Sequence, residues 1–261
     1  MSRPGRDGTA RARAAAPIAA LAAVCYLPLL LTHRGMVGAD TKSYLYLDPD
    51  RLLGRAWSMW DPNVGLGTVP HQNIGYLWPM GPFFWAFERL GVPDWLAQRL
   101  WLGSILFLAG LGVRYLLRGL GRDGPGVAAA MFVYALTPYV LTLGARISAL
   151  LLPFTALGWL VGLVIRACRE RSWAHPALFA LAVPTFGSTN ATALLLVGLG
   201  PALWIVHVVA RREVTIGRAA AVIGRIGILT VATSLWWIVG LWCQGAFGID
   251  VLRYTETART V

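Results

Sequence analysis

Three carboxylates follow the first apolar segment of this chain, within the stretch GADTKSYLYLDPD at residues 38–50. Residues 16–33 carry no charge, so Asp40, Asp48 and Asp50 lie at the mouth of a segment that suits a membrane. Acids at a membrane rim suit chemistry on a substrate that is itself anchored in lipid. If that substrate is a sugar on a polyprenyl phosphate, transfer needs a base that takes the proton of an acceptor hydroxyl while the lipid phosphate leaves. Asp40, only a few residues beyond the apolar segment, is the best placed candidate for this base.

Basic and polar side chains near these acids are candidate substrate contacts. Four cations could offset the charge of a phosphate: Arg34, Lys42, Arg51 and Arg55. Farther along, His71, Gln72 and Asn73 stand among aromatic residues, which is typical of a sugar-binding edge and equally of a plain polar loop. Arg99, near the start of the next apolar run, is expected to extend to the membrane surface or to meet an acid of the loop.

Asp48 and Asp50 also have a purely structural interpretation. They flank Pro49, and acids in such a position form a turn or cap a helix, here one that begins near Arg51. Two acids could also hold a divalent cation, although the sequence provides no further ligands in a recognisable pattern. The sequence therefore specifies no cofactor, and a divalent metal stays possible.

The composition of the chain is that of an integral membrane protein. Of its 261 residues 57% are hydrophobic and 13% charged, and the mean hydropathy is +0.60. The net charge of +11 does not indicate a nucleic-acid partner, because the basic residues lie between apolar runs instead of on one face of a polar domain. The three cysteines are widely spaced, show no metal-ligand pattern and are interpreted as structural.

Apolar runs occupy residues 15–33, 96–117, 125–145, 147–166, 175–187, 191–210 and 220–245. A helix that crosses a bilayer needs about 20 apolar residues, so the sequence predicts an all-α polytopic transmembrane bundle of about seven spans. The N-terminal tail and every second connection after it are rich in arginine, which is the positive-inside pattern. The pattern predicts a cytoplasmic N-terminus, with residues 1–13 as a disordered cytoplasmic tail.

The same topology makes residues 34–95 the first extracytoplasmic loop. This loop holds six of the twelve acids and five tryptophans. Tryptophan favours the headgroup level of a membrane, so we expect short amphipathic helices lying on the outer surface.

A second polar interruption, GSTN at residues 187–190, separates two runs that are together too short for two full spans. One prediction places it below the outer surface, lining a cavity, and makes Asn190 a candidate substrate contact. An ordinary helical hairpin with a polar tip is the alternative.

Three long strings of this sequence resemble one known family. They are GADTKSYLYLDPDRLL, WDPNVGLGTVPHQNIGYLWPMGPFFW and GVPDWLAQRLWLGSILFLAGLGVRYLL, and the similarity extends through GSTNATALLL. Together they resemble the N-terminal membrane region of the mycobacterial and actinobacterial alpha-(1→3)-arabinofuranosyltransferases of the D family. The resemblance covers most of the chain.

The resemblance implies a polytopic glycosyltransferase of the GT-C class in the plasma membrane. Its donor would be decaprenylphosphoryl arabinose, and its acceptor the arabinan of arabinogalactan and lipoarabinomannan on the extracytoplasmic side. In such enzymes a carboxylate of the first outward loop commonly acts as base, and Asp40 within GAD is the residue that matches. Family members are much longer, so residues 14–261 are expected to be the N-terminal part of a GT-C transmembrane domain, and the chain a fragment.

Two other functions are weighed against this one. A transporter or flippase of lipid-linked sugars would carry charged residues within several spans and internal repeats, and the sequence has few such charges and no repeat at a fixed period. A truncated, inactive fragment that binds lipid is the other alternative.

Overall fold

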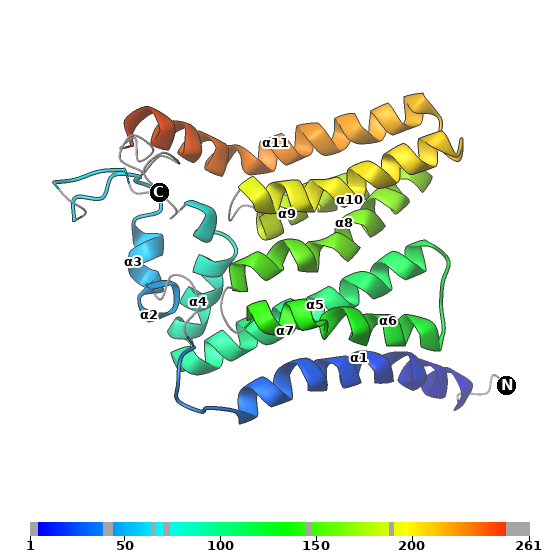
Figure 1. Cartoon of the computed structure of the whole chain (residues 1–261), viewed down its shortest axis with the longest axis horizontal. Helices are drawn as coiled ribbons and strands as arrows, with labels where there is room; N and C mark the ends of the chain where they lie inside the picture. Colours follow the sequence, from blue (N-terminus) through cyan, green and yellow to red (C-terminus); the bar gives the residue numbers. More distant parts are fainter. Residues whose placement is uncertain are drawn as a thin grey trace, which may run out of the picture.

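The computed structural model describes residues 5–38, 44–63, 66–69, 74–144, 148–187 and 191–248. Within these residues no strand forms, and a single antiparallel bridge joins Asp61 and Thr68. The helices are α1 (Gly5–Leu31), α2 (Tyr44–Leu47), α3 (Pro49–Gly54), η1 (Ile74–Tyr76), α4 (Met80–Arg89), α5 (Asp94–Gly119), α6 (Pro125–Ala135), α7 (Pro138–Gly144), η2 (Ser148–Leu150), α8 (Leu151–Arg169), α9 (Ala174–Gly187), α10 (Ala191–Ala210) and α11 (Ile216–Phe247). The long helices lie side by side, and α2, α3 and α4 gather at one end of the bundle, opposite the N-terminus (Figure 1).

The predicted all-α membrane bundle is confirmed. Five segments are long and apolar enough to cross a membrane: Asp94–Gly119, Pro125–Gly144, Ser148–Arg169, Thr192–Ala210 and Ile216–Phe247. Two further apolar helical segments, Ala15–Leu31 and Ala174–Gly187, are shorter. The 14 residues of α9 rise only about 21 Å at 1.5 Å each, against a hydrocarbon layer of about 30 Å. The short member of the pair predicted between residues 175 and 210 is therefore α9.

The N-terminal helix differs from its prediction at its start. α1 begins at Gly5, so residues 5–13, predicted to be a disordered tail, are helical. The segment is rich in alanine and arginine, both strong helix formers, and these residues extend the helix that the apolar run begins. The cytoplasmic location of the N-terminus stays a prediction.

The apolar run at residues 125–145 forms two helices instead of one. α6 ends at Ala135, and α7 begins at Pro138. Proline has no N–H to donate and disfavours helical backbone in the residue before it, which breaks the helix at Thr137. α7 lies between α6 and the end of the bundle where α2, α3 and α4 lie (Figure 1).

Glycines bring α5 into close contact with its neighbours on two sides. A Cβ atom on Gly103 or Gly110 would overlap Tyr26 or Leu21 of α1, at 2.3 and 2.7 Å. Small residues of this kind let membrane helices approach closely without a hydrophobic driving force between them. On the other side a Cβ atom on Gly112 would lie 2.8 Å from Trp159 of α8, so α5 is held between α1 and α8.

Arginines tie the helices together at the end opposite α2, α3 and α4. Arg166 of α8 donates to the carbonyl of Tyr115 in α5 at 3.0 Å, and Arg169 donates to the carbonyl of Gly119. Arg218 of α11 donates to the carbonyl of Ala167 in α8 at 3.1 Å. The last carbonyls of a helix have no partner within it, and cations there also complement the helix dipole.

The loop between α1 and α5 folds onto the bundle instead of lying apart from it. Its short helices share an apolar cluster with the start of α5 that includes Leu45, Tyr46, Met80, Phe84 and Trp101. The short helices predicted for residues 34–95 are thus present in the described part of this loop. Their packing holds the loop over the first turns of α5.

Candidate active site

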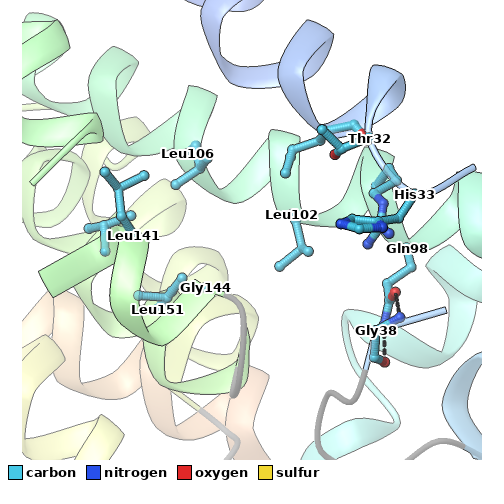
Figure 2. Close-up of a pocket in the computed structure, with 12 residues that line it drawn as sticks. Thr32, His33, Gly38, Gln98, Leu102, Leu106, Leu141, Gly144 and Leu151 are labelled. Carbon is cyan, nitrogen blue, oxygen red and sulfur yellow. Dashed lines mark hydrogen bonds between the residues drawn. The ribbon is translucent and has the colours of Figure 1, made fainter. Parts of the chain in front are cut away.

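A cavity of about 300 Å³ lies where the end of α1, the first turns of α5 and α7 converge. One part of its lining is polar: Thr32, His33, Gly38, Gln98 and Arg99. The other part is apolar: Leu102, Leu106, Val140, Leu141 and Leu151. Figure 2 shows Thr32, His33, Gln98 and Gly38 on one side, Leu106, Leu141 and Leu151 on the other, and Leu102 between them.

The polarity of the cavity follows from the helical period of α5. Residues 98, 99, 102 and 106 share one face of the helix, because residues three and four apart are neighbours. The polar pair Gln98 and Arg99 occupies the first turns of α5, and the leucines follow toward its middle. The cavity is therefore polar beside the loop and apolar toward the middle of α5.

Gln98 holds the loop at the polar end of the cavity. Its side chain is 1% exposed. Its Oε1 accepts from the backbone N–H of Gly38 at 2.7 Å, and its Nε2 donates to the carbonyl of the same residue at 3.0 Å (Figure 2). The hydroxyl of Tyr46 donates to that carbonyl as well, at 3.3 Å.

Arg99 brings a positive charge to the same end. Its Nη2 donates to the carbonyl of Met36 at 3.1 Å. Its Nε is shielded from solvent and finds no acceptor among the described residues. Arg99 forms no ion pair with a described carboxylate, so the expected contact with an acid of the loop is not found there. An anion that enters the cavity would meet the positive charge of Arg99.

The predicted base lies outside the described residues. So do the predicted contacts Lys42, His71, Gln72, Asn73 and Asn190. The described chain reaches Gly38 on one side of Asp40 and resumes at Tyr44 on the other. Asp40 is two positions beyond Gly38, the residue that Gln98 holds against the cavity.

The other predicted cations do not line the cavity. Arg34 and Arg51 are exposed. Arg55 donates to Asp61 at 2.7 Å, in a contact that leaves the two side chains 33% and 18% exposed. The backbone N–H of Asn63 also donates to this carboxylate, at 2.9 Å. These two hydrogen bonds, that of Asn63 first, lower the pKa of Asp61 below its ordinary value.

Asp48 and Asp50 have structural partners. Asp48 caps α3, since its Oδ1 accepts from the backbone N–H of Arg51 at 3.1 Å, and Pro49 is the first residue of that helix. Asp50 accepts from Arg89 of α4 at 2.6 and 2.8 Å. The interpretation of Asp48 as a helix cap is thus confirmed. In the described part of the chain no three His, Cys, Asp or Glu side chains gather as a metal site would require.

Sequence reasoning missed most of the cavity. Thr32, His33, Gln98 and Leu141 come from three separate parts of the chain, and no local pattern joins them. One signal was available, namely the adjacent polar residues Gln98 and Arg99 at the start of an otherwise apolar run. Two polar side chains next to a membrane span are a sign of a functional position.

The known proteins that this chain resembles bear one name. The chain is 37% identical over 175 residues to the Alpha-(1->3)-arabinofuranosyltransferase of Mycobacterium tuberculosis. The aligned residues are 65% of this chain and 12% of that protein. It is 33% identical over 228 residues to the protein of the same name from Mycolicibacterium smegmatis, covering 86% of this chain and 16% of the relative. The chain therefore spans less than a fifth of the length of either relative.

The fold agrees with a solved structure of the same kind. The cryo-EM structure of arabinofuranosyltransferase AftD from Mycobacteria matches 88% of this chain and 18% of its own, with a TM-score of 0.79 and 29% sequence identity. The family profile described as Alpha-(1->3)-arabinofuranosyltransferase, N-terminal GT-C domain, matches residues 24–261. A profile match of this extent shows that the chain belongs to the family of N-terminal GT-C domains of alpha-(1->3)-arabinofuranosyltransferases.

Proposed function

We propose that this chain carries the donor site of a plasma-membrane glycosyltransferase that moves arabinofuranose from decaprenylphosphoryl arabinose to the arabinan of arabinogalactan and lipoarabinomannan. The observation that carries the proposal is the cavity between α1, α5 and α7, which is apolar inside the span and polar beside Gly38. A polyprenyl phosphate has the same division between tail and headgroup. The active site would face the extracytoplasmic side.

The donor would lie along α5. Its first isoprene units would contact the apolar side chains of the cavity, such as Leu102, Leu106 and Leu141. Its phosphate would meet Arg99, which lines the cavity and whose planar guanidinium suits phosphate oxygens. The arabinose would then extend toward the loop, where Asp40 and Lys42 occur in the sequence.

The chemical step needs one base and one leaving group. Asp40 takes the proton of an acceptor hydroxyl while its oxygen attacks the anomeric carbon. The bond between that carbon and the phosphate oxygen breaks, the configuration inverts, and polyprenyl phosphate leaves with both electrons of the broken bond. Arg99 stabilises the charge that develops on the phosphate. His71, Gln72, Asn73 and Asn190 stay proposed contacts for the sugars.

The test is transfer of labelled arabinose from decaprenylphosphoryl arabinose to a synthetic arabinan acceptor. The assay uses membranes that contain the gene product carrying this chain, as wild type, Asp40→Asn and Arg99→Met. We expect Asp40→Asn to abolish transfer at normal expression, and Arg99→Met to raise the donor KM at least about tenfold, as loss of a charged hydrogen bond does. Arg211→Met is the matched control, because Arg211 is an exposed arginine that does not line the cavity.

Each outcome bears on a separate part of the proposal. Transfer that persists in Asp40→Asn would move the search for the base to Asp48 or Asp50. Movement of a labelled lipid-linked sugar across proteoliposomes, without transfer to the acceptor, would favour a flippase instead.

A further inference from the structure

Arg225 of α11 is a cation without a carboxylate partner among the described residues. Its guanidinium lies over the indole ring of Trp173, 4.9 Å from the ring centroid, in a cation–π contact that holds the side chain in place. Its Nη1 is 3.5 Å from the carbonyl oxygen of Arg171, at the limit for a hydrogen bond. A guanidinium has five N–H donors, so the contacts within the described chain leave most of those of Arg225 unused.

The length of α11 places Arg225 at the boundary of the hydrocarbon layer. The helix has 32 residues, which is about 48 Å at 1.5 Å each, against a layer of about 30 Å. Residues 226–247 carry no charge, and this stretch of about 33 Å fills the layer by itself. Arg225 therefore lies at the level of the lipid phosphates, and the helix before it extends beyond them. Trp173, which contacts Arg225, lies at the level that tryptophan favours.

The acids at this end of the bundle do not neutralise Arg225. Glu170 pairs with His175 at 3.0 Å. Asp123 and Glu213 have arginine partners of their own, at 3.1 and 3.9 Å. The segments 114–123, 166–171 and 211–225 hold ten arginines and only these three acids. The end is therefore strongly positive and attracts anions.

We propose that Arg225, Trp173 and Arg171 form a site for the anionic headgroup of a membrane phospholipid. The lipid phosphate would accept from the unused donors of Arg225, and the exposed side chain of Arg171 would add a second cation. The acyl chains would lie along α9, where Leu178 and Leu181 are exposed. Basic sites between helices at the headgroup level are typical of anionic-lipid recognition. The site shares no residue with the cavity proposed to bind the donor, so it does not depend on the proposed function.

The test measures which lipid gathers at Trp173. The gene product that carries this chain is placed in nanodiscs of phosphatidylcholine that contain a minor fraction of brominated phosphatidylglycerol, or the same fraction of brominated phosphatidylcholine. Bromine quenches nearby tryptophan, and the part of the quenching that Trp173→Phe removes belongs to Trp173. We expect the anionic lipid to be enriched at Trp173 at least about fivefold over the neutral lipid.

Variants of one arginine separate the site from the general charge of this end. Arg225→Met should remove most of the enrichment, whereas Arg225→Lys should retain part of it, because lysine keeps the charge and loses the planar fork. Arg211→Met is the matched control, since it removes the same charge from an exposed side chain at the same end, and it should leave the enrichment unchanged. Each variant is compared with its own Trp173→Phe form, and its unfolding temperature in phosphatidylcholine alone reports whether it is folded.

Three outcomes would overturn the proposal. Equal quenching of Trp173 by the two brominated lipids would show that no anionic lipid binds there. Equal losses in Arg225→Met and Arg211→Met would replace the site by diffuse attraction to the positive end of the bundle. Loss of the enrichment on adding inorganic phosphate at constant ionic strength would assign Arg225 to a soluble anion instead.

Discussion

Gly158 of α8 lies directly against Gly112 of α5, so closely that a Cβ atom on Gly158 would be 2.4 Å from the carbonyl carbon of Gly112. The two helices therefore touch through their backbones. Gly162, one turn further along α8, faces the ring of Tyr115 of α5, where a Cβ atom would lie 2.6 Å from Cδ1. This contact fixes the helix that carries Gln98 and Arg99, and with it the wall of the cavity.

Gly158→Ala should therefore loosen the bundle. The added methyl group meets backbone atoms, which cannot rotate away, and we expect a loss of at least about 1–3 kcal/mol of folding free energy. Thermal unfolding in detergent, followed by the loss of the monodisperse peak in size exclusion, measures the effect. Gly198→Ala in α10 is the control, since a Cβ there meets nothing within 4 Å. It should be neutral or stabilise by about 0.5–1 kcal/mol. Equal behaviour of the two variants would contradict the packing argument.

Arg218→Met should separate the start of α11 from the end of α8. Arg218 donates to the carbonyls of Ala167 and Cys168, at 3.1 and 3.4 Å, and to that of Glu170. Hydrogen bonds from charged donors contribute about 1.5–3 kcal/mol, so we expect a lower unfolding temperature. In Arg211→Met the temperature should stay within error, because among the described residues the side chain of Arg211 reaches Glu213 alone, at 3.9 Å. An Arg218→Met variant as stable as wild type would show that these carbonyls are satisfied by other groups.

Asp61 should titrate below the ordinary range of an aspartate. Its pKa is lowered first by the N–H of Asn63 and then by Arg55. A depressed pKa contributes stability above the unfolded value of about 3.9, and this stability disappears as the pH falls through the lower folded value. Selective carbon-13 labelling of aspartate, with Asp61→Asn to assign the carboxyl signal, measures the pKa. In Arg55→Met the pKa should rise but stay below about 3.9, because the bond from Asn63 remains. An unchanged pKa in that variant would exclude a contribution from Arg55.

Asp48 and Asp50 should differ in their effects on stability. Asp48→Ala removes the cap of α3 and is expected to cost about 1 kcal/mol. Asp50→Asn breaks a pair whose side chains are 45% and 60% exposed, and such pairs contribute less than about 1 kcal/mol. Thermal unfolding with and without Mg²⁺ or Mn²⁺ also tests the possible metal. We expect no stabilisation by either ion, and a metal-dependent rise that Asp50→Asn abolishes would instead assign these acids to a cation site.

The helices of this chain were predictable because apolar length alone specifies a span. The run at 191–210 became α10 with those bounds, and the run at 96–117 became α5, Asp94–Gly119. The break before Pro138 was missed because the apolar count continues across it. The helical course of residues 5–13 was missed because arginine indicates a polar tail and is also a strong helix former.

The cavity could not be predicted in the same way. Its position depends on how the end of α1, the first turns of α5 and α7 come together, and these segments are far apart in the sequence. Arg34, Arg51 and Arg55 were chosen by nearness to Asp40 along the chain, whereas Arg99, which lines the cavity, follows it by 59 positions. The cap formed by Asp48 was predictable because a helix start is a local event.

The arginine contacts between helices also have a direction along the chain. Arg166 and Arg169 of α8 reach carbonyls of α5, and Arg218 of α11 reaches carbonyls of α8, so in each contact the acceptor precedes the donor. During synthesis the acceptor helix has therefore already left the ribosome when its arginine emerges. These contacts can form in the order of translation, each new hairpin docking on the one inserted before it.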